Sequence, residues 1–189
     1  MNVAIIGRPN VGKSALFNRL AGRKIAIVHD QPGITRDRLY ATCRLGAEPF
    51  TLFDTGGIVG AGESELIAEV QRVVQETIRE SDFLIFVVDG KSGLTPIDQE
   101  IARMVRRSGK PTVLAVNKID HEKNENLAAE FASLGFERTV SISAEHNRGI
   151  SELLDQIDRV VEPGETKNRE SRIENRRPSR WIRGDDSGR

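Results

Sequence analysis

Apolar residues along this chain fall into short continuous runs that alternate with segments of helical spacing. The runs predict strands near 2–6, 38–45, 49–54, 83–89, 112–116 and 138–142. Apolar residues three and four positions apart predict helices near 13–21, 64–79, 97–108, 124–134 and 149–161. Strands that alternate with helices are typical of a mainly parallel sheet with helices on both faces. A hairpin around Gly46 would add one antiparallel edge strand, so we expect an α/β fold with a six-stranded sheet.

The loop after the first predicted strand fits the pattern G-x-x-x-x-G-K-[ST], which indicates a nucleoside triphosphate. Its glycines let the backbone curl so that several N–H groups face one anion at the start of the next helix. Lys13 can reach the β- and γ-phosphates, and the Ser14 hydroxyl can bind Mg²⁺. The residues expected at this site are Gly7, Arg8, Pro9, Asn10, Val11, Gly12, Lys13, Ser14 and Ala15. A purely structural glycine-rich turn is the alternative that this strand–loop–helix context disfavours.

The pattern N-K-x-D, from Asn117 through Lys118 to Asp120, follows the fifth predicted strand. The Asp120 carboxylate can accept two hydrogen bonds, and guanine offers two donors side by side. Adenine lacks these donors and would leave the carboxylate unpaired, which makes discrimination large. Asn117 can donate and accept, so it can contact the base and also tie this loop to the phosphate loop. By itself the motif could equally be a polar turn, but after a phosphate loop it favours a guanine nucleotide.

A third motif, from Asp54 to Gly57, follows the predicted strand 49–54. An acidic residue at the carboxyl end of a strand can hold Mg²⁺, usually through water. The Gly57 backbone N–H could reach the γ-phosphate. A D-x-x-G pattern alone would indicate little, so its weight comes from the two motifs that flank it.

These three motifs, in this order and spacing, resemble the small GTPase domain family. The resemblance implies that 32–37 is the first switch, in which Thr35 closes on Mg²⁺ when the triphosphate is bound. It also implies a last guanine loop, where a backbone N–H meets the base O6. That loop corresponds to Ser143, Ala144 and Glu145.

The chain resembles the first G domain of the EngA/Der family more closely, in the motifs G-R-P-N-V-G-K-S, P-G-I-T-R-D and D-T-G-G-I. Members of this family are bacterial tandem-domain GTPases of ribosome assembly. The resemblance covers about residues 1–162 and implies a P-loop GTPase domain. It also implies GTP or GDP as ligand and a ribosomal subunit or rRNA as the partner of the full-length protein. Family members carry a second G domain and an RNA-binding-like domain, for which the 189 residues leave no room.

The segment 163–189 changes in composition, because it is rich in arginine and poor in apolar residues. Such a segment buries too little surface to offset its ordering entropy, so we expect a charged, disordered linker or tail. An RNA-contacting arm is the alternative, since arginines together with Trp181 suit phosphate contacts and base stacking.

Charge and composition place few other constraints on function. The 28 basic and 28 acidic residues cancel, so no overall field steers the chain to nucleic acid or to a membrane. We expect no signal peptide before the first strand, and the apolar run 83–88 is too short to cross a bilayer. Cys43, the only cysteine, is expected to be a core residue. We expect a cytoplasmic monomer without a membrane partner.

The predicted reaction is hydrolysis of GTP to GDP and phosphate, assisted by Lys13, Thr35, Gly57 and Asn10. Many GTPases place a water-orienting glutamine after D-x-x-G, whereas this chain has Ile58, so slow intrinsic turnover is expected. In related GTPases with an apolar residue there, the asparagine that matches Asn10 helps to bind K⁺. Arg8 and Arg36 are alternative sources of positive charge, and either could equally be a solvated loop residue.

Two other functions stay open at this stage. The domain could be a nucleotide-dependent docking module with negligible turnover of its own. A partner would then contact the loop near residue 30 and the helix from Glu63 to Arg79, which follows the D-x-x-G motif, the second switch of the family. An ATPase is the third possibility, which Asp120 disfavours.

Overall fold

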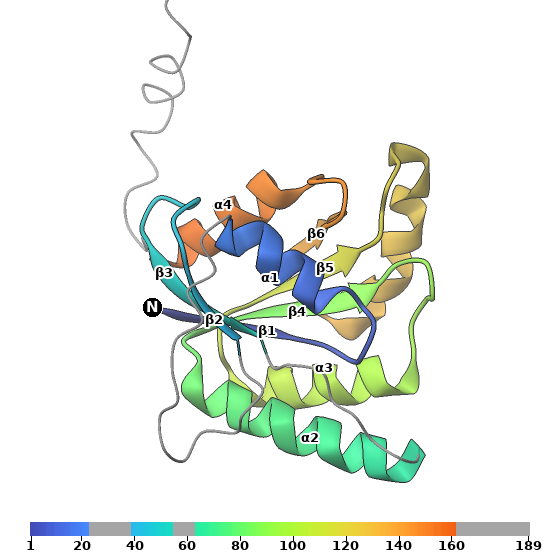
Figure 1. The fold of residues 1–189 in the computed structure, drawn as a ribbon. Coiled ribbons are helices and arrows are strands. Elements are labelled where there is room, and N and C mark those ends of the chain that lie inside the picture. Colours follow the sequence, from blue (N-terminus) through green and yellow to red (C-terminus); the bar gives the residue numbers. More distant parts are fainter. Residues whose placement is uncertain (23–38, 55–62, 162–189) are drawn as a thin grey trace, which may run out of the picture.

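The chain forms one six-stranded sheet with helices on both faces, and residues 1–22, 39–54 and 63–161 are described by the computed structural model (Figure 1). The strands are β1 (Asn2–Ile6), β2 (Leu39–Cys43), β3 (Phe50–Asp54), β4 (Phe83–Asp89), β5 (Thr112–Asn117) and β6 (Thr139–Ser141). The helices are α1 (Lys13–Ala21), α2 (Glu63–Glu80), α3 (Pro96–Ser108), the 3-10 helix η1 (Glu122–Leu134) and α4 (Ile150–Val161).

The strand order is β2-β3-β1-β4-β5-β6, and every pairing is parallel except that of β2 with β3. Leu39 lies opposite Asp54 and Cys43 opposite Phe50, so the segment around Gly46 closes a hairpin. The predicted fold, with one antiparallel strand at an edge of a mainly parallel sheet, is confirmed. The predicted tail, 163–189, lies outside the described residues.

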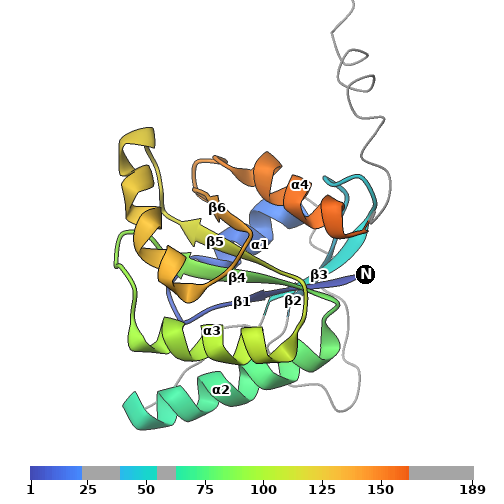
Figure 2. The same cartoon turned by 180° about the vertical axis from the view of Figure 1, so that it is seen from behind.

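The continuous apolar runs of the strands reflect burial on both faces of the sheet. All seven residues of β4 are buried. One core cluster lies between the sheet and the pair α1 and α4, with Phe17 and Leu153 among its members. The other lies between the sheet and α2, α3 and η1, with Val74 and Phe131 among its members. Figures 1 and 2 show α1 with α4 on one face and α2 with α3 on the other.

Helix α3 begins and ends where its sequence dictates. The Thr95 hydroxyl accepts from the Asp98 N–H, and the Asp98 carboxylate accepts from the Thr95 N–H, which makes a capping box. Pro96 follows at the first helical position, and Gly109 closes the helix at φ +66°. This capping matters for function because Asp98 also contacts the loop after β1.

The helix predicted at 124–134 winds differently from expectation. It is a 3-10 helix over Glu122–Leu134, where the apolar pattern suggested an ordinary helix. Phe131 and Leu134, its buried apolar residues, are three positions apart, and that spacing fits either winding. The pattern therefore predicted a helical segment without fixing its hydrogen-bond register.

The predicted motifs gather at one edge of the sheet. Because β1, β3, β4, β5 and β6 run parallel, the loops that follow them leave the sheet on the same side. Open α/β sheets bind ligands at this carboxyl edge. Over the described parts of the chain, no helix combines the length and apolar character needed to cross a bilayer.

Candidate functional site

The loop between β1 and α1 is shaped by close approaches that only glycine allows. Gly7 has φ +153°, and a Cβ there would lie 2.4 Å from the Val87 carbonyl oxygen on β4. Gly12 has φ +97°, and a Cβ there would lie 2.3 Å from the Asn117 side-chain nitrogen. Asn10 also adopts a left-handed conformation, at φ +66°. The loop is thus pressed against β4 and the end of β5, which fixes its curl.

Lys13 is the first residue of α1, and its amine lies within the loop. Its Nζ donates to the Arg8 carbonyl oxygen at 3.0 Å, and the residue is only 7% exposed. Burial lowers the pKa of Lys13, the charge of Asp54 opposes that shift, and the charge of Arg8 adds to it. Gly12 precedes the helix without a capping side chain, so N–H groups of the first turn are available to an anion. Backbone and amine together form a cradle for a phosphate group.

Ser14 and Asp54 come from separate elements and meet at the mouth of this loop. The Ser14 hydroxyl donates to Asp54 Oδ2 at 3.2 Å, and Asp54 ends β3 with 1% exposure. No cluster of three or more His, Cys, Asp or Glu suited to a metal occurs among the described residues. Mg²⁺ commonly takes one or two protein oxygens and completes its shell with phosphate and water, so the hydroxyl–carboxylate pair fits Mg²⁺.

Asn117 ties three loops together through one buried amide. Its Nδ2 donates to the Val11 carbonyl oxygen at 2.8 Å, and its Oδ1 accepts from the Ala144 N–H at 3.0 Å. The link to the phosphate loop that the sequence suggested is present. The same side chain also holds the loop that carries Ser143, Ala144 and Glu145.

Lys118 provides a second link between the loops, and it is held by Asp89, a residue that the sequence analysis did not predict at the site. Its Nζ donates to the Asn10 carbonyl oxygen at 2.9 Å and to Asp89 Oδ2 at 2.6 Å. Burial opposes ionisation of Asp89, but hydrogen bonds from Lys118 and Ser92 outweigh it and lower the pKa. The available signal was an acidic residue directly after the apolar run 83–88, at the carboxyl end of a strand.

Asp120 presents a carboxylate that is already engaged on both oxygens. Ser143 Oγ donates to Oδ1 at 2.9 Å, and Lys91 Nζ donates to Oδ2 at 2.5 Å. His146 Nε2 lies 3.9 Å from Oδ1. The hydrogen bond from Lys91, followed by that from Ser143, lowers the pKa of Asp120. Lys91 has no motif signal in the sequence, and it enters the site only through the fold.

The last of the three loops is anchored to α1. Arg19 donates to the backbone carbonyl oxygens of Ala144, at 3.0 Å, and Glu145, at 2.7 Å. Ser143 and Arg148 exchange backbone hydrogen bonds that close a turn between them. The loop therefore keeps a defined position beside Asp120.

Arg8 has a partner on α3. Its Nε lies 3.3 Å from Asp98 Oδ2, and the two side chains are 15% and 0% exposed. This contact argues against the alternative that Arg8 is a solvated loop residue. The other predicted catalytic residues in the switches, Thr35 and Gly57, lie outside the described residues, as do Ile58 and Arg36.

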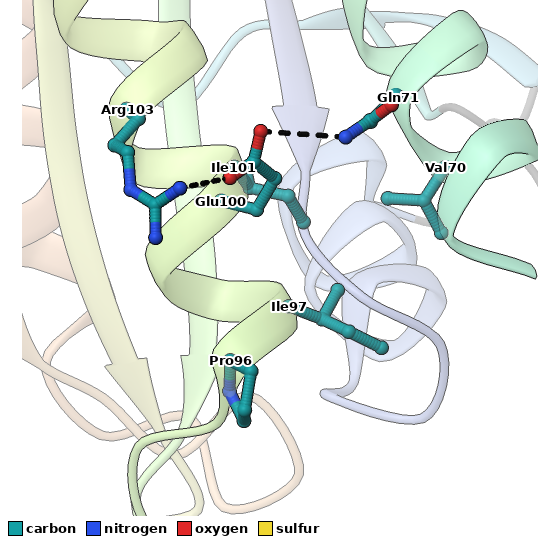
Figure 3. Close-up of a pocket in the computed structure, with 7 residues that line it drawn as sticks. All are labelled: Val70, Gln71, Pro96, Ile97, Glu100, Ile101 and Arg103. Atoms are coloured by element: carbon teal, nitrogen blue, oxygen red, sulfur yellow. Dashed lines mark hydrogen bonds and ion pairs between the residues drawn. The ribbon is translucent and has the colours of Figure 1, made fainter. Parts of the chain in front are cut away.

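A separate cavity of about 350 Å³ lies between α2 and α3 (Figure 3). Its lining residues are Val70, Gln71, Pro96, Ile97, Glu100, Ile101 and Arg103. Glu100 bridges the two helices by accepting from Gln71 at 3.3 Å. Among the residues that the structure describes, no predicted phosphate or base contact lines this cavity, so it is not the phosphate or base site.

The fold and the three linked loops define a P-loop nucleotide-binding domain of the GTPase class. The family described as "50S ribosome-binding GTPase" matches residues 2–118. The chain is 50% identical over 155 residues to GTPase Der of Aquifex aeolicus (strain VF5), covering 82% of this chain and 36% of that protein. It is 48% identical over 165 residues to GTPase Der of Geobacter metallireducens, covering 87% of this chain and 38% of that protein.

Solved structures agree with this relationship. Aquifex aeolicus Era bound to GDP and AlF4⁻ is 32% identical with a TM-score of 0.68, over 87% of this chain and 57% of that chain. Era in complex with MgGDPNP and a segment of 16S ribosomal RNA is 30% identical with a TM-score of 0.68, over 89% of this chain and 59% of that chain. The chain belongs to the 50S ribosome-binding GTPase family and corresponds to the first G domain of Der/EngA. It spans little more than a third of the length of the curated relatives.

Proposed function

We propose that this chain binds guanine nucleotides with Mg²⁺ and hydrolyses GTP to GDP and phosphate as a molecular switch. The observation that carries the proposal is the linkage of the phosphate loop to the base loop. Asn117 bonds to Val11 and Lys118 bonds to Asn10, so the two loops have a fixed separation. One nucleotide that spans them would contact the Lys13 cradle with its phosphates and Asp120 with its base.

Each predicted site residue has a part in this proposal. The loop from Gly7 to Ala15 holds the phosphates, with Lys13 neutralising their charge. Ser14, Asp54 and Thr35 would hold Mg²⁺, and the ion would supply positive charge against the charge that develops on the phosphates. Gly57 donates to the γ-phosphate. The base contacts come from Asn117, Lys118, Asp120, Ser143, Ala144 and Glu145.

The test of base choice is the variant Asp120→Asn. Xanthine carries a carbonyl where guanine has its N2 amine, and an amide can donate to that carbonyl. We expect GDP affinity to fall by about tenfold or more and XDP affinity to rise, measured with labelled nucleotides. Unchanged GDP binding would contradict the base assignment.

Lys13→Ala should weaken GTP binding without lowering the thermal stability of the nucleotide-free protein.

A potassium ion beside the phosphates is the second part of the proposal. It draws support from Asn10, whose exposed side chain offers a hard oxygen beside the loop, and from the apolar Ile58. Because Asn10 has φ +66°, Asn10→Gly removes the amide without backbone strain, whereas Asn10→Ala adds strain. GTP hydrolysis should be faster in KCl than in NaCl at equal ionic strength, and Asn10→Gly should abolish the difference.

We further propose that the full-length protein acts on a ribosomal subunit or its rRNA. Der and Era relatives support this partner class. Single-turnover GTP hydrolysis with and without purified ribosomal subunits tests it. Stimulation by the subunits supports a switch, fast turnover alone supports an autonomous enzyme, and no turnover in either case leaves a docking module.

A further inference from the structure

The carboxylate assigned to the base has a donor on each of its two oxygens. Lys91 Nζ lies 2.5 Å from Asp120 Oδ2, while Ser143 occupies the other oxygen. Lys91 has no role in the motifs that identify the family. It reaches Asp120 from the turn after β4, a separate loop of the same sheet edge.

The backbone of this turn is held rigidly. Asp89 Oδ1 accepts from the Lys91 N–H at 2.9 Å and from the Ser92 N–H at 3.2 Å, and Lys118 holds the other oxygen of Asp89. A Cβ on Gly90 would lie 2.5 Å from Ile119 Cδ1, so the turn is packed against the base loop. Lys91 is thus directed toward Asp120 by its backbone, while its side chain is 54% exposed and can swing into water.

Guanine and Lys91 need the same acceptor. Guanine would present N–H donors to the Asp120 oxygens, and an ammonium at one oxygen places positive charge beside those donors. Repulsion between the ammonium and these donors favours the departure of Lys91 when guanine binds. Adenine has no such donors, so Lys91 can stay, and the carboxylate is not left unpaired. The free-energy cost of an unpaired Asp120 carboxylate, which would otherwise weaken adenine binding, is therefore smaller when Lys91 stays.

We propose that Lys91 is an internal competitor of guanine at Asp120 and a specificity-determining residue that limits the preference for guanine over adenine. This inference rests on the proposed guanine-nucleotide function. It goes beyond that function because it assigns discrimination to a residue outside the base-recognition motif.

The test is the variant Lys91→Met, which keeps the length of the side chain and removes its charge. An exposed ion pair contributes little, so GDP affinity should rise by about two- to fivefold. ADP affinity should stay the same or fall. GDP and ADP carry the same phosphates, so any change in electrostatic attraction cancels in the ratio of their affinities. The gain should shrink at about 1 M salt, where exposed charges are screened, and Lys91→Arg should restore the original ratio.

Arg103→Met is the matched control, because Arg103 is a similarly exposed cation paired with Glu100 on α3. It should leave the GDP-to-ADP ratio unchanged. Failure of the unaltered protein to bind GDP would overturn the proposed function itself. If that protein binds GDP and Lys91→Met leaves the ratio unchanged or lowers it, the function stands and the competition is overturned. A lowered ratio would mean that Lys91 supports the carboxylate while guanine is bound.

Discussion

The phosphate loop and the base loop reach the same site by different physical means. The phosphate loop is held by buried contacts, among them Gly7 against Val87, Asn117 at 3% exposure and Asp98 at 0% exposure. The Asp120 carboxylate instead has exposed side chains beside it, the Lys91 ammonium at 2.5 Å and the His146 ring at 3.9 Å. Buried contacts resist substitution because the vacated partner stays desolvated, whereas exposed charges exchange with water at little cost. The phosphate loop is therefore preformed, whereas the pairing of the Asp120 carboxylate is adjustable.

The largest expected effect is that of Gly7→Ala on stability. The new Cβ meets a backbone oxygen at 2.4 Å, and the φ of +153° suits only glycine, so strain and overpacking add to about 4 kcal/mol. Urea unfolding of the nucleotide-free variant measures the loss. Gly109→Ala is the control, since φ there is +66° but no atom lies within 4 Å, and its cost should be about 1 kcal/mol. Equal costs at the two positions would mean that the loop is not pressed on β4.

Next in size is Asp98→Asn, which removes the charge that faces Arg8 while retaining an oxygen for the cap. Breaking a buried ion pair leaves an uncompensated charge, so the expected loss is about 3 kcal/mol. The same helix offers a half-exposed pair, Glu100 with Arg103, as the control, and Glu100→Gln keeps an acceptor oxygen for Gln71. Glu100→Gln should cost less than about 0.5 kcal/mol in the same thermal or urea experiment. A loss for Asp98→Asn as small as that of the control would mean that the Arg8–Asp98 pair does not help to hold the phosphate loop.

Asn117→Ala should cost about 2 kcal/mol even without nucleotide, because the Val11 carbonyl and the Ala144 N–H both lose their partner. Chemical unfolding of the nucleotide-free protein gives this value, and release of labelled GDP should become faster. Asn18→Ala, on the exposed side of α1, is a control that should leave both measurements close to those of the unaltered protein. Faster GDP release with unchanged stability would assign Asn117 to the ligand alone.

The smallest expected effect concerns the charge state of Asp120. Its pKa lies below the ordinary value of 3.8, chiefly because of the hydrogen bond from Lys91. A depressed folded-state pKa adds stability above about pH 3.8, and that stability is lost as the pH falls through the lowered value. Carboxyl NMR titration of Lys91→Met should show the Asp120 pKa moving up toward 3.8. No movement would mean that Ser143 alone sets the ionisation.

Much of the architecture follows from local sequence. The apolar run of β4 identified a strand buried on both faces, and Thr95, Pro96 and Asp98 marked the start of α3 by their capping chemistry. The phosphate and base motifs could be placed on loops because each follows a predicted strand. The winding of η1 could not be predicted, since Phe131 and Leu134 fit two helical periods.

The sequence by itself determined the elements, the sheet class and the residue types suited to phosphate and guanine, because these depend on short-range periodicity and on motifs of a few residues. The sequence also suggested the tie from Asn117 to the phosphate loop, but the tertiary structure alone decided the other polar contacts. Arg8 pairs with Asp98 across 90 positions, and Lys91 reaches Asp120 across 29. Such partners depend on how loops from parallel strands converge at one edge of the sheet, and no local pattern encodes that convergence.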